Sequence, residues 1–404
     1  MNDEIIEFLN SNNYDVRISR NARWIDQKCT MDVLSVVSDC IIEYVKDDIK
    51  KEFTTKDIWY NDYTVDNVQM IFKKPNPAKK AKNEYDKWFG QPMKLLGYAQ
   101  ILIETKKRGK NCYIVNNEKI LKYISQRDSN ALNFLRLYIE KVLSDSEMKV
   151  YFDNFLEKQN KETFKKLKEE FAQFTIHNTN INGSVECGRI FTKVLNPLAF
   201  YNNKKGAKNG HMSKAKITID MLQYNRYNWR DINKDKPKDV TRKEFEYRDD
   251  QQNSLIEYKI QKAKRILKEF NIKYRDGYSE MPEDGVYLKE GTMVHHIFPK
   301  ADFPILADYL ENLIVLTPTQ HLAKAHPNGS TSYVDKNYQY ALLVCKIENI
   351  KNNLLNPDQE SIYDFDCMLS VLNTGLNTDN FSDIDRMDFK AVLDQLDLIY
   401  KMKW

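Results

Sequence analysis

The sequence predicts the α+β fold class, in a mostly helical chain of several domains. Its 404 residues are enough for two or three domains of the usual size, about 100–200 residues each. Apolar residues recur at helical spacing over most of the chain, whereas strand-like runs gather around residues 99–115 and 292–317. We therefore expect four parts, at residues 1–120, 121–240, 241–350 and 351–404.

The first part begins with helical patterns. Residues 30–51 carry apolar side chains at helical spacing, and Thr30 is a suitable N-cap for them. Thr54 or Thr55 can cap a short second helix, and the segment "VDNVQMIFKK" predicts a third. Three helices are thus expected before the first strands.

A β-hairpin is expected next. Residues 99–104 and 111–115 favour strands, and the segment between them is basic and contains Gly109. Three helices followed by a hairpin is the order of a winged helix, which lays one helix in the DNA major groove and its wing along the backbone. A generic α+β domain with surface lysines is the alternative. The hairpin cations expected to contact DNA are Lys106, Lys107, Arg108 and Lys110.

Residues 121–240 read as amphipathic helices followed by a basic connector. The connector has no Asp or Glu between Cys187 and Ile219 but contains seven Lys and Arg, whereas the whole chain has a net charge of only +4. Positive charge concentrated in this way suits a polyanion, although a solvated basic face is the alternative. The connector residues expected to contact DNA are Lys204, Lys205, Lys208, Lys214, Arg226 and Arg230.

The last two parts are a histidine-rich region that a long helix precedes and an acidic helical segment. Residues 241–270 predict the long helix, and from Pro357 onward ten acids face four bases. Four of the six histidines lie within 32 residues, at positions 295, 296, 321 and 326. Residues 292–299 and 310–317 predict two strands, and Pro318 is well placed in the first turn of a following helix.

This strand–strand–helix order, with "HHIFPK", "ENLIVLTPTQH" and "AHPNG", resembles the HNH, or ββα-metal, nuclease motif. The resemblance implies that His295 and His321 hold a metal ion and that His296 is the general base. It also implies that Asn312, nine residues before His321, fixes the loop by hydrogen bonds. A structural or coincidental histidine cluster is the alternative.

These residue types suit phosphodiester hydrolysis. A neutral imidazole titrates near the working pH and can accept a proton from water. Two imidazoles leave most coordination positions of an ion open, which is typical of a catalytic rather than a structural metal. We expect one divalent ion per site, Mg²⁺ first, with Mn²⁺ or another transition metal as the alternative. The six cysteines form no CxxC pair, so no structural zinc is expected.

Three further residues beside the motif are candidates for a phosphate contact or a supporting role. His326 lies five residues past His321, so it is either an additional ligand or a helix-terminal histidine. Lys300 and Lys324 can contact phosphate, or can be solvated surface lysines.

The whole arrangement resembles HNH-type type II restriction endonucleases, and segments such as "GRIFTKVLNPLAF" are also similar to chains of that kind. This resemblance implies double-stranded DNA as substrate, a homodimer at least on DNA, a companion DNA methyltransferase and a prokaryotic cytoplasm. Another HNH nuclease (nicking, mobile-element or RNA-directed) and a non-catalytic winged-helix DNA-binding protein are the alternatives.

No membrane segment or leader is expected. No apolar run approaches the roughly 18–20 residues of a membrane helix. The first residues, "MNDEIIEFLN", carry acids where a signal peptide needs bases and then an apolar stretch.

Overall fold

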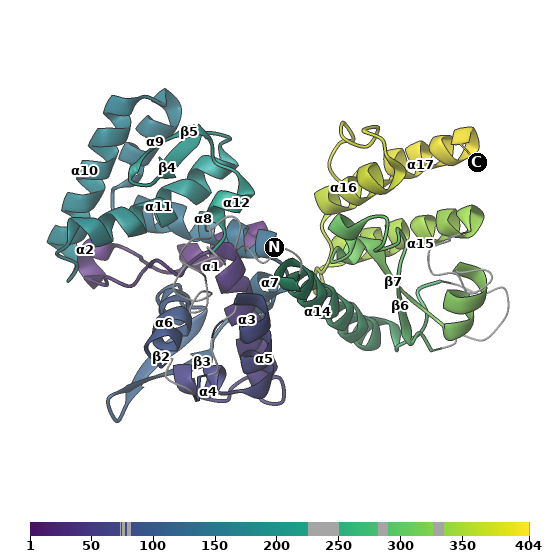
Figure 1. Cartoon of the computed structure of the whole chain (residues 1–404), viewed down its shortest axis with the longest axis horizontal. Helices are drawn as coiled ribbons and strands as arrows, with labels where there is room; N and C mark the ends of the chain where they lie inside the picture. Colours follow the sequence, from purple (N-terminus) through teal and green to yellow (C-terminus); the bar gives the residue numbers. More distant parts are fainter. Residues whose placement is uncertain are drawn as a thin grey trace, which may run out of the picture. The chain divides into compact units, whose positions relative to one another are not determined.

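The computed structural model describes residues 1–72, 74, 77–78, 82–224, 250–281, 290–325 and 335–403. Most of them are helical, and they contain three small antiparallel sheets, so the predicted α+β class is confirmed at this level. The chain divides into two compact units, Met1–Glu246 and Tyr247–Trp404. Figure 1 shows the elements of each unit.

The first unit opens with helices that lead to a three-stranded sheet. Thr54 caps α4 through a capping box: its side chain accepts a bond from the Asp57 N–H, and the Asp57 carboxylate accepts one from the Thr54 N–H. The sheet has the order β1-β3-β2. Helix α6, which interrupts the expected passage from three helices to a hairpin, was not predicted. The elements are α1 (Asn2–Asn10), α2 (Val16–Ser19), α3 (Met31–Val45), β1 (Phe53–Thr54), α4 (Thr55–Trp59), α5 (Asp62–Phe72), α6 (Lys82–Tyr98), β2 (Leu102–Lys107) and β3 (Lys110–Val115).

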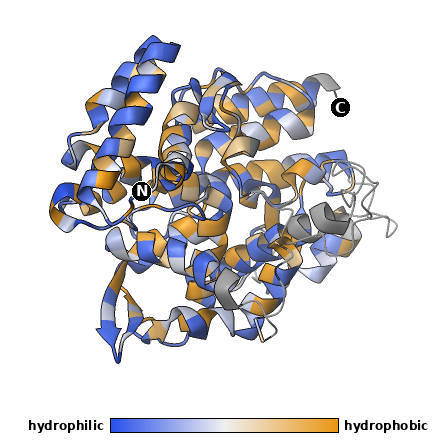
Figure 2. Cartoon of the chain, turned by 60° about the vertical axis from the view of Figure 1, so that its left-hand side comes forward, coloured by the Kyte–Doolittle hydropathy of each residue, from blue (hydrophilic) through white to orange (hydrophobic). Residues whose placement is uncertain are grey.

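The predicted hairpin is present as β2 and β3, with a shorter turn than expected. Lys107 faces Lys110 in the register, which leaves a two-residue turn. Arg108 and Gly109 both have positive φ, 49° and 76°, as a tight hairpin turn matching the strand twist requires. The strands therefore continue into the basic segment, and the hydrophilic hairpin tip can be followed in Figures 1 and 2.

The rest of the first unit is a helical layer with a second hairpin. Helix α3 packs against α7 and α8, so the expected division at residue 120 does not separate two packed bodies. Asn209 and Gly210 form the turn of the second hairpin with φ of 52° and 78°. The elements are α7 (Glu118–Gln126), α8 (Asp128–Asp145), α9 (Lys149–Lys158), α10 (Lys161–Asn178), α11 (Ser184–Tyr201), β4 (Lys205–Lys208), β5 (His211–Lys216) and α12 (Ile219–Leu222).

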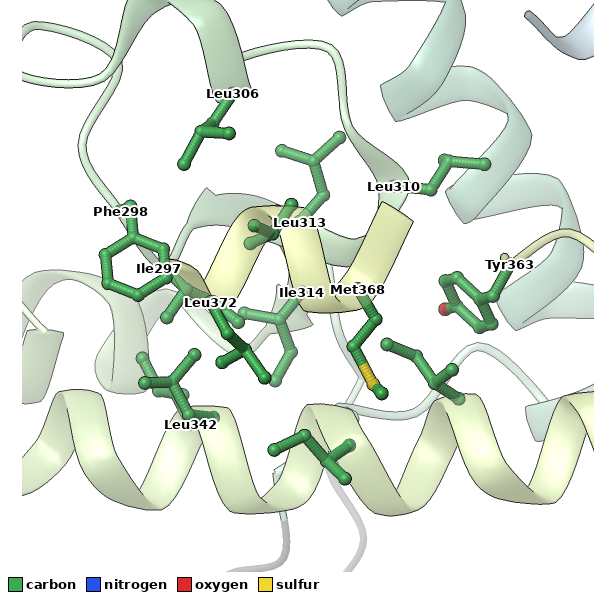
Figure 3. Close-up of a cluster of buried hydrophobic side chains, with 14 of the residues drawn as sticks. Ile297, Phe298, Leu306, Leu310, Leu313, Ile314, Leu342, Tyr363, Met368 and Leu372 are labelled. Carbon is green, nitrogen blue, oxygen red and sulfur yellow. The ribbon is translucent and has the colours of Figure 1, made fainter. Parts of the chain in front are cut away.

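The second unit surrounds a two-stranded sheet with helices. Side chains from the loop after β6, from β7, from α15 and from α16 point toward one another in one core (Figure 3). This core spans residues from 263 to 400, so the expected acidic segment 351–404 shares it with the histidine region. The elements are α14 (Asp250–Arg275), β6 (Met293–His296), η1 (Pro304–Leu306), η2 (Leu310–Asn312), β7 (Leu313–Leu316), the π-helix η3 (Gln320–Ala325), α15 (Lys336–Leu355), α16 (Phe365–Leu376) and α17 (Phe389–Lys403).

One glycine lets α16 approach the loop after β6. A Cβ on Gly375 would lie 2.4 Å from ring carbons of Phe298, a separation that carbon atoms do not tolerate. Phe298 itself is buried and forms part of the core in Figure 3. The packing of the histidine-bearing loop thus depends on the absence of a side chain at residue 375.

Among the helices described here, none has the length and apolar character needed to cross a membrane.

Candidate metal centre and active site

The histidines lie on the predicted strand–strand–helix scaffold. β6 pairs with β7 in antiparallel register, with His295 opposite Ile314 and His296 opposite Leu313. Both strands are four residues long, shorter than expected, because the flanking residues form the loop 297–309 and the 3₁₀ turn η2. His296 is therefore the last residue of its strand.

Two reciprocal hydrogen bonds fix the start of the helix after β7, which carries His321. The Thr317 hydroxyl accepts a bond from the Gln320 N–H at 3.1 Å, and the Gln320 side-chain oxygen accepts one from the Thr317 N–H at 3.0 Å. This reciprocal pair is a capping box, and Pro318 occupies the first position, where no N–H is needed. The His321 N–H donates to the Thr317 carbonyl at 3.0 Å, which places His321 in the first turn of the helix.

His295 and His321 are brought together. Their ring centroids lie 5.1 Å apart with an interplanar angle of 78°. His295 is only 2% exposed, and its Nε2 and the Nδ1 of His321 are buried nitrogen atoms. With metal–nitrogen bonds of about 2.1 Å, an ion lies roughly 3.2 Å from each centroid, so two adjacent ligand rings have centroids about 4.6–5.3 Å apart. The observed pair fits a shared divalent ion.

The described residues place no third metal-binding side chain with this pair. Within the residues that the structure describes, no group of three or more His, Cys, Asp or Glu side chains is placed to hold a metal ion. Among the described residues, an ion here would therefore have two imidazoles as protein ligands.

Asn312 ties the loop after β6 together. Its side-chain oxygen accepts a bond from the Phe298 N–H at 2.8 Å, and its amide donates to the carbonyls of Phe298 and Leu306, both at 3.1 Å. Its own carbonyl accepts from the Ile297 N–H at 2.9 Å. Asn312 is fully buried, so these bonds replace water that its amide would otherwise need. This geometry fixes the loop that directly follows His296.

The ring of His296 is held by a main-chain carbonyl. Its Nε2 lies 3.0 Å from the Ala307 oxygen. A carbonyl can only accept, so the bond places the proton on Nε2 and leaves Nδ1 as an acceptor. Burial lowers the pKa of His296 to about 4, with nearby Lys264 and Lys300 lowering it further and the Ala307 bond and Glu257 opposing them. The ring is therefore neutral at pH 7, but the expectation that it titrates near the working pH is not met.

Helix α14 supplies charges near His296 that the sequence did not point to. Lys264 contributes to the low pKa of His296, and burial lowers the pKa of Lys264 itself. Glu257 bonds the Nζ of Lys300 at 2.7 Å, which lowers the pKa of Glu257. Lys300, expected as a phosphate contact, thus has a carboxylate partner. No sequence signal connects residues 257 and 264 with a strand 30 to 40 positions later.

A buried ionic group, Glu280 with Arg275 and Lys346, is bonded to strand β7. Glu280 receives the Val315 N–H on Oε1 at 2.9 Å, and its own N–H bonds the Val315 carbonyl at 2.8 Å. Its other oxygen lies 2.7 Å from Arg275 and 3.5 Å from Lys346. Burial lowers the pKa of Lys346 to about 8, against the attraction of Glu280. Glu280 therefore holds Val315 of β7 through both its main chain and its side chain.

The expected DNA-contacting cations have mixed surroundings. At the first hairpin, Lys107 pairs with Glu52 at 2.5 Å. At the second, Lys204 and Lys205 are half-buried. The exposed members of the expected set are Lys106, Lys107, Arg108, Lys110, Lys208 and Lys214. Arg226, Arg230, His326 and the side chain of Lys324 lie outside the described residues.

No protein-family model matches the chain, no curated protein matches it, and no solved structure matches it.

Proposed function

We propose that the chain is a metal-dependent DNA endonuclease of the HNH type, acting as a site-specific type II restriction enzyme. The observation that carries the proposal is the pairing of His295 with His321 at 5.1 Å, on a strand and a helix joined by β7. The buried imidazole of His295 and the half-buried imidazole of His321 at this separation fit a divalent cation, for which Mg²⁺ is our first choice. Such an ion would supply Lewis-acid stabilisation of charge on a phosphate.

The residues of the chain would do the proton transfer. His296 is neutral at pH 7, and its Nε2 is engaged with the Ala307 carbonyl, which leaves Nδ1 to accept a proton from water. Asn312 acts through the loop as a positioning residue, since it holds the backbone at Phe298 and Leu306. Its bonds keep the histidine end of β6 in one conformation.

The first unit would recognise DNA. Its helices α3, α4 and α5, with the sheet order β1-β3-β2 and an exposed basic hairpin tip, support a winged-helix-like reading of residues 1–120. A single active site per chain cuts one strand at a time, so cleavage of both strands supports a homodimer on DNA. A companion methyltransferase would protect the host sequence.

The test is cleavage of duplex DNA of known sequence with Mg²⁺. His296→Ala should lower the cleavage rate by about 10²–10⁴-fold, as expected when a general base is removed. The matched control is His177→Ala, which changes an exposed histidine of the first unit. His295→Ala and His321→Ala should also weaken Mn²⁺ binding measured by calorimetry without DNA.

The ends of the products separate the alternatives. Cuts on both strands at one short sequence support a restriction enzyme, whereas nicks alone point to another HNH nuclease. Cleavage by His296→Ala at the unaltered rate would remove the catalytic assignment. If the unaltered chain binds the duplex but shows no metal-dependent cleavage, it is a non-catalytic DNA-binding protein instead.

A further inference from the structure

The first unit contains a second candidate site that the histidine chemistry does not use. It is a cavity of about 950 Å³, within the size range of ligand pockets. Its walls come from the loop before α3, from α10, from the first half of α11, from the β4–β5 turn and from Tyr224. The cationic side chains that line it are Lys28, Lys165, Lys168, Arg189 and Lys193.

The charge of this cavity is strongly positive. Among the lining residues that the structure describes, five cations accompany one carboxylate, that of Glu169, which lies 3.8 Å from Lys165 and is well exposed. In the described part of the chain, neither Arg189 nor Lys193 has a carboxylate within ion-pair distance. Burial lowers the pKa of Lys193, and the attraction of the Asp32 carboxylate opposes that shift. An anion entering the cavity would supply what these side chains lack.

Two of the cations are held in place by the fold. Lys168 donates to the Gly210 carbonyl at 2.7 Å, in the hairpin turn that the positive φ of Gly210 allows. Lys28 donates to the Tyr224 hydroxyl at 2.7 Å and lies 4.4 Å from the centroid of that ring. These contacts orient the two cations before any ligand arrives.

The lining favours phosphate over a nucleobase. Phe191 is 2% exposed and packs against Phe164 and Phe171, so it offers no open ring face. The face of Tyr224 already holds Lys28. Nothing in the described lining therefore offers the aromatic platform on which bases stack, whereas cations that follow a phosphate backbone are abundant.

We infer that this cavity binds consecutive phosphates of a nucleic-acid backbone. Its volume is larger than one phosphate needs, and its cations come from segments as far apart in sequence as residues 28 and 193. The phosphate chemistry stands on the cavity alone. The identification of this nucleic acid as duplex DNA rests on the proposed endonuclease function.

The experiment measures binding of a labelled duplex to the full chain in EDTA by fluorescence anisotropy, between about 50 and 200 mM salt. Lys165→Gln with Arg189→Gln removes two exposed cavity cations. The matched control, Lys161→Gln with Lys166→Gln, removes two exposed charges that do not line the cavity, both from α10. We expect the cavity pair to reduce the slope of log K against log salt by about 2 and to weaken binding roughly tenfold at low salt. The control pair should change either value much less.

Two results would overturn the inference. Equal losses from both pairs would mean that long-range charge, not the cavity, attracts DNA. The cavity would instead belong to a small free anion if the Lys165→Gln, Arg189→Gln variant lost tripolyphosphate binding but kept the wild-type affinity for the duplex. The binding assay contains EDTA and no metal, whereas the nuclease proposal is tested by cleavage with Mg²⁺, so failure of one proposal is distinguishable from failure of the other.

Discussion

The histidine site and the basic cavity use polar side chains in opposite ways. At the histidine site, Asn312 and His295 are buried, and each is fixed by specific hydrogen bonds or a ring contact. In the cavity, Lys165 and Arg189 are exposed cations on helix surfaces. Proton transfer and metal binding need fixed geometry, whereas attraction of a polyanion needs charge that tolerates small displacements. We therefore expect changes in packing to harm the histidine site far more than the cavity.

The largest effect should come from Asn312→Ala. The change leaves the Phe298 N–H and two carbonyls without their buried partner, so the free energy of unfolding should fall by about 2–4 kcal/mol. Urea unfolding followed by circular dichroism measures it. Asn337→Ala, at an exposed position of α15, is the control. Under conditions in which the Asn312→Ala variant is folded, it should still bind the duplex in EDTA. If the variant loses binding together with cleavage, the two sites are not separate.

A pair of glycine substitutions gives a smaller effect and opposite signs. Gly375→Ala places a Cβ 2.4 Å from the Phe298 ring, so it should lower the free energy of unfolding by about 1–3 kcal/mol. Gly90→Ala in α6 meets nothing within 4 Å and should raise it by about 0.5–1 kcal/mol. Thermal unfolding of the two variants tests both. Stabilisation by Gly375→Ala would show that the close approach of α16 to Phe298 is absent.

A further effect concerns the pH dependence of stability. The pKa of Lys346 is lowered to about 8 by burial, whereas an ordinary lysine titrates near 10.5. Between these values the unfolded chain binds more protons, so the contribution of Lys346 makes the free energy of unfolding rise with pH. Tyr363, whose pKa burial raises, opposes this trend above about pH 10.

Urea unfolding at pH 7.5 and at pH 9.5 isolates the lysine. The wild-type chain should show a steeper gain between the two values than Lys346→Met, which keeps the length and removes the charge. An identical gain in both proteins would mean that the ammonium group of Lys346 is solvated in the folded state.

Several elements could be predicted because their signals are local. Thr54 and Thr317 begin helices as N-cap residues, and the strand patterns around the histidines have the expected order. The second hairpin had a local signal too, since Asn209–Gly210 is typical of a two-residue turn. The Asn-Gly pair, and not the positive charge around it, is the signal for this element.

Other features had no local signal. Ala307 as the partner of His296, Glu280 as the partner of Val315, and Gly375 beside Phe298 each join residues 11 to 77 positions apart. Helix α6 contains Pro92 and Gly90, which weaken a helical prediction, yet Trp88, Phe89 and Met93 bury it against the rest of the unit. Packing overrides propensity at such places.

By itself the sequence determined the kinds of element, their order, and the spacing that puts imidazoles on a strand end and a helix start. Those properties follow from neighbours within one or two turns, where backbone sterics and capping act. Only the tertiary structure decided that the rings at 295 and 321 meet, that burial keeps His296 uncharged, and that five cations line one cavity. Exclusion of water and convergence of charge depend on segments distant in the chain, and they exist only after those segments pack.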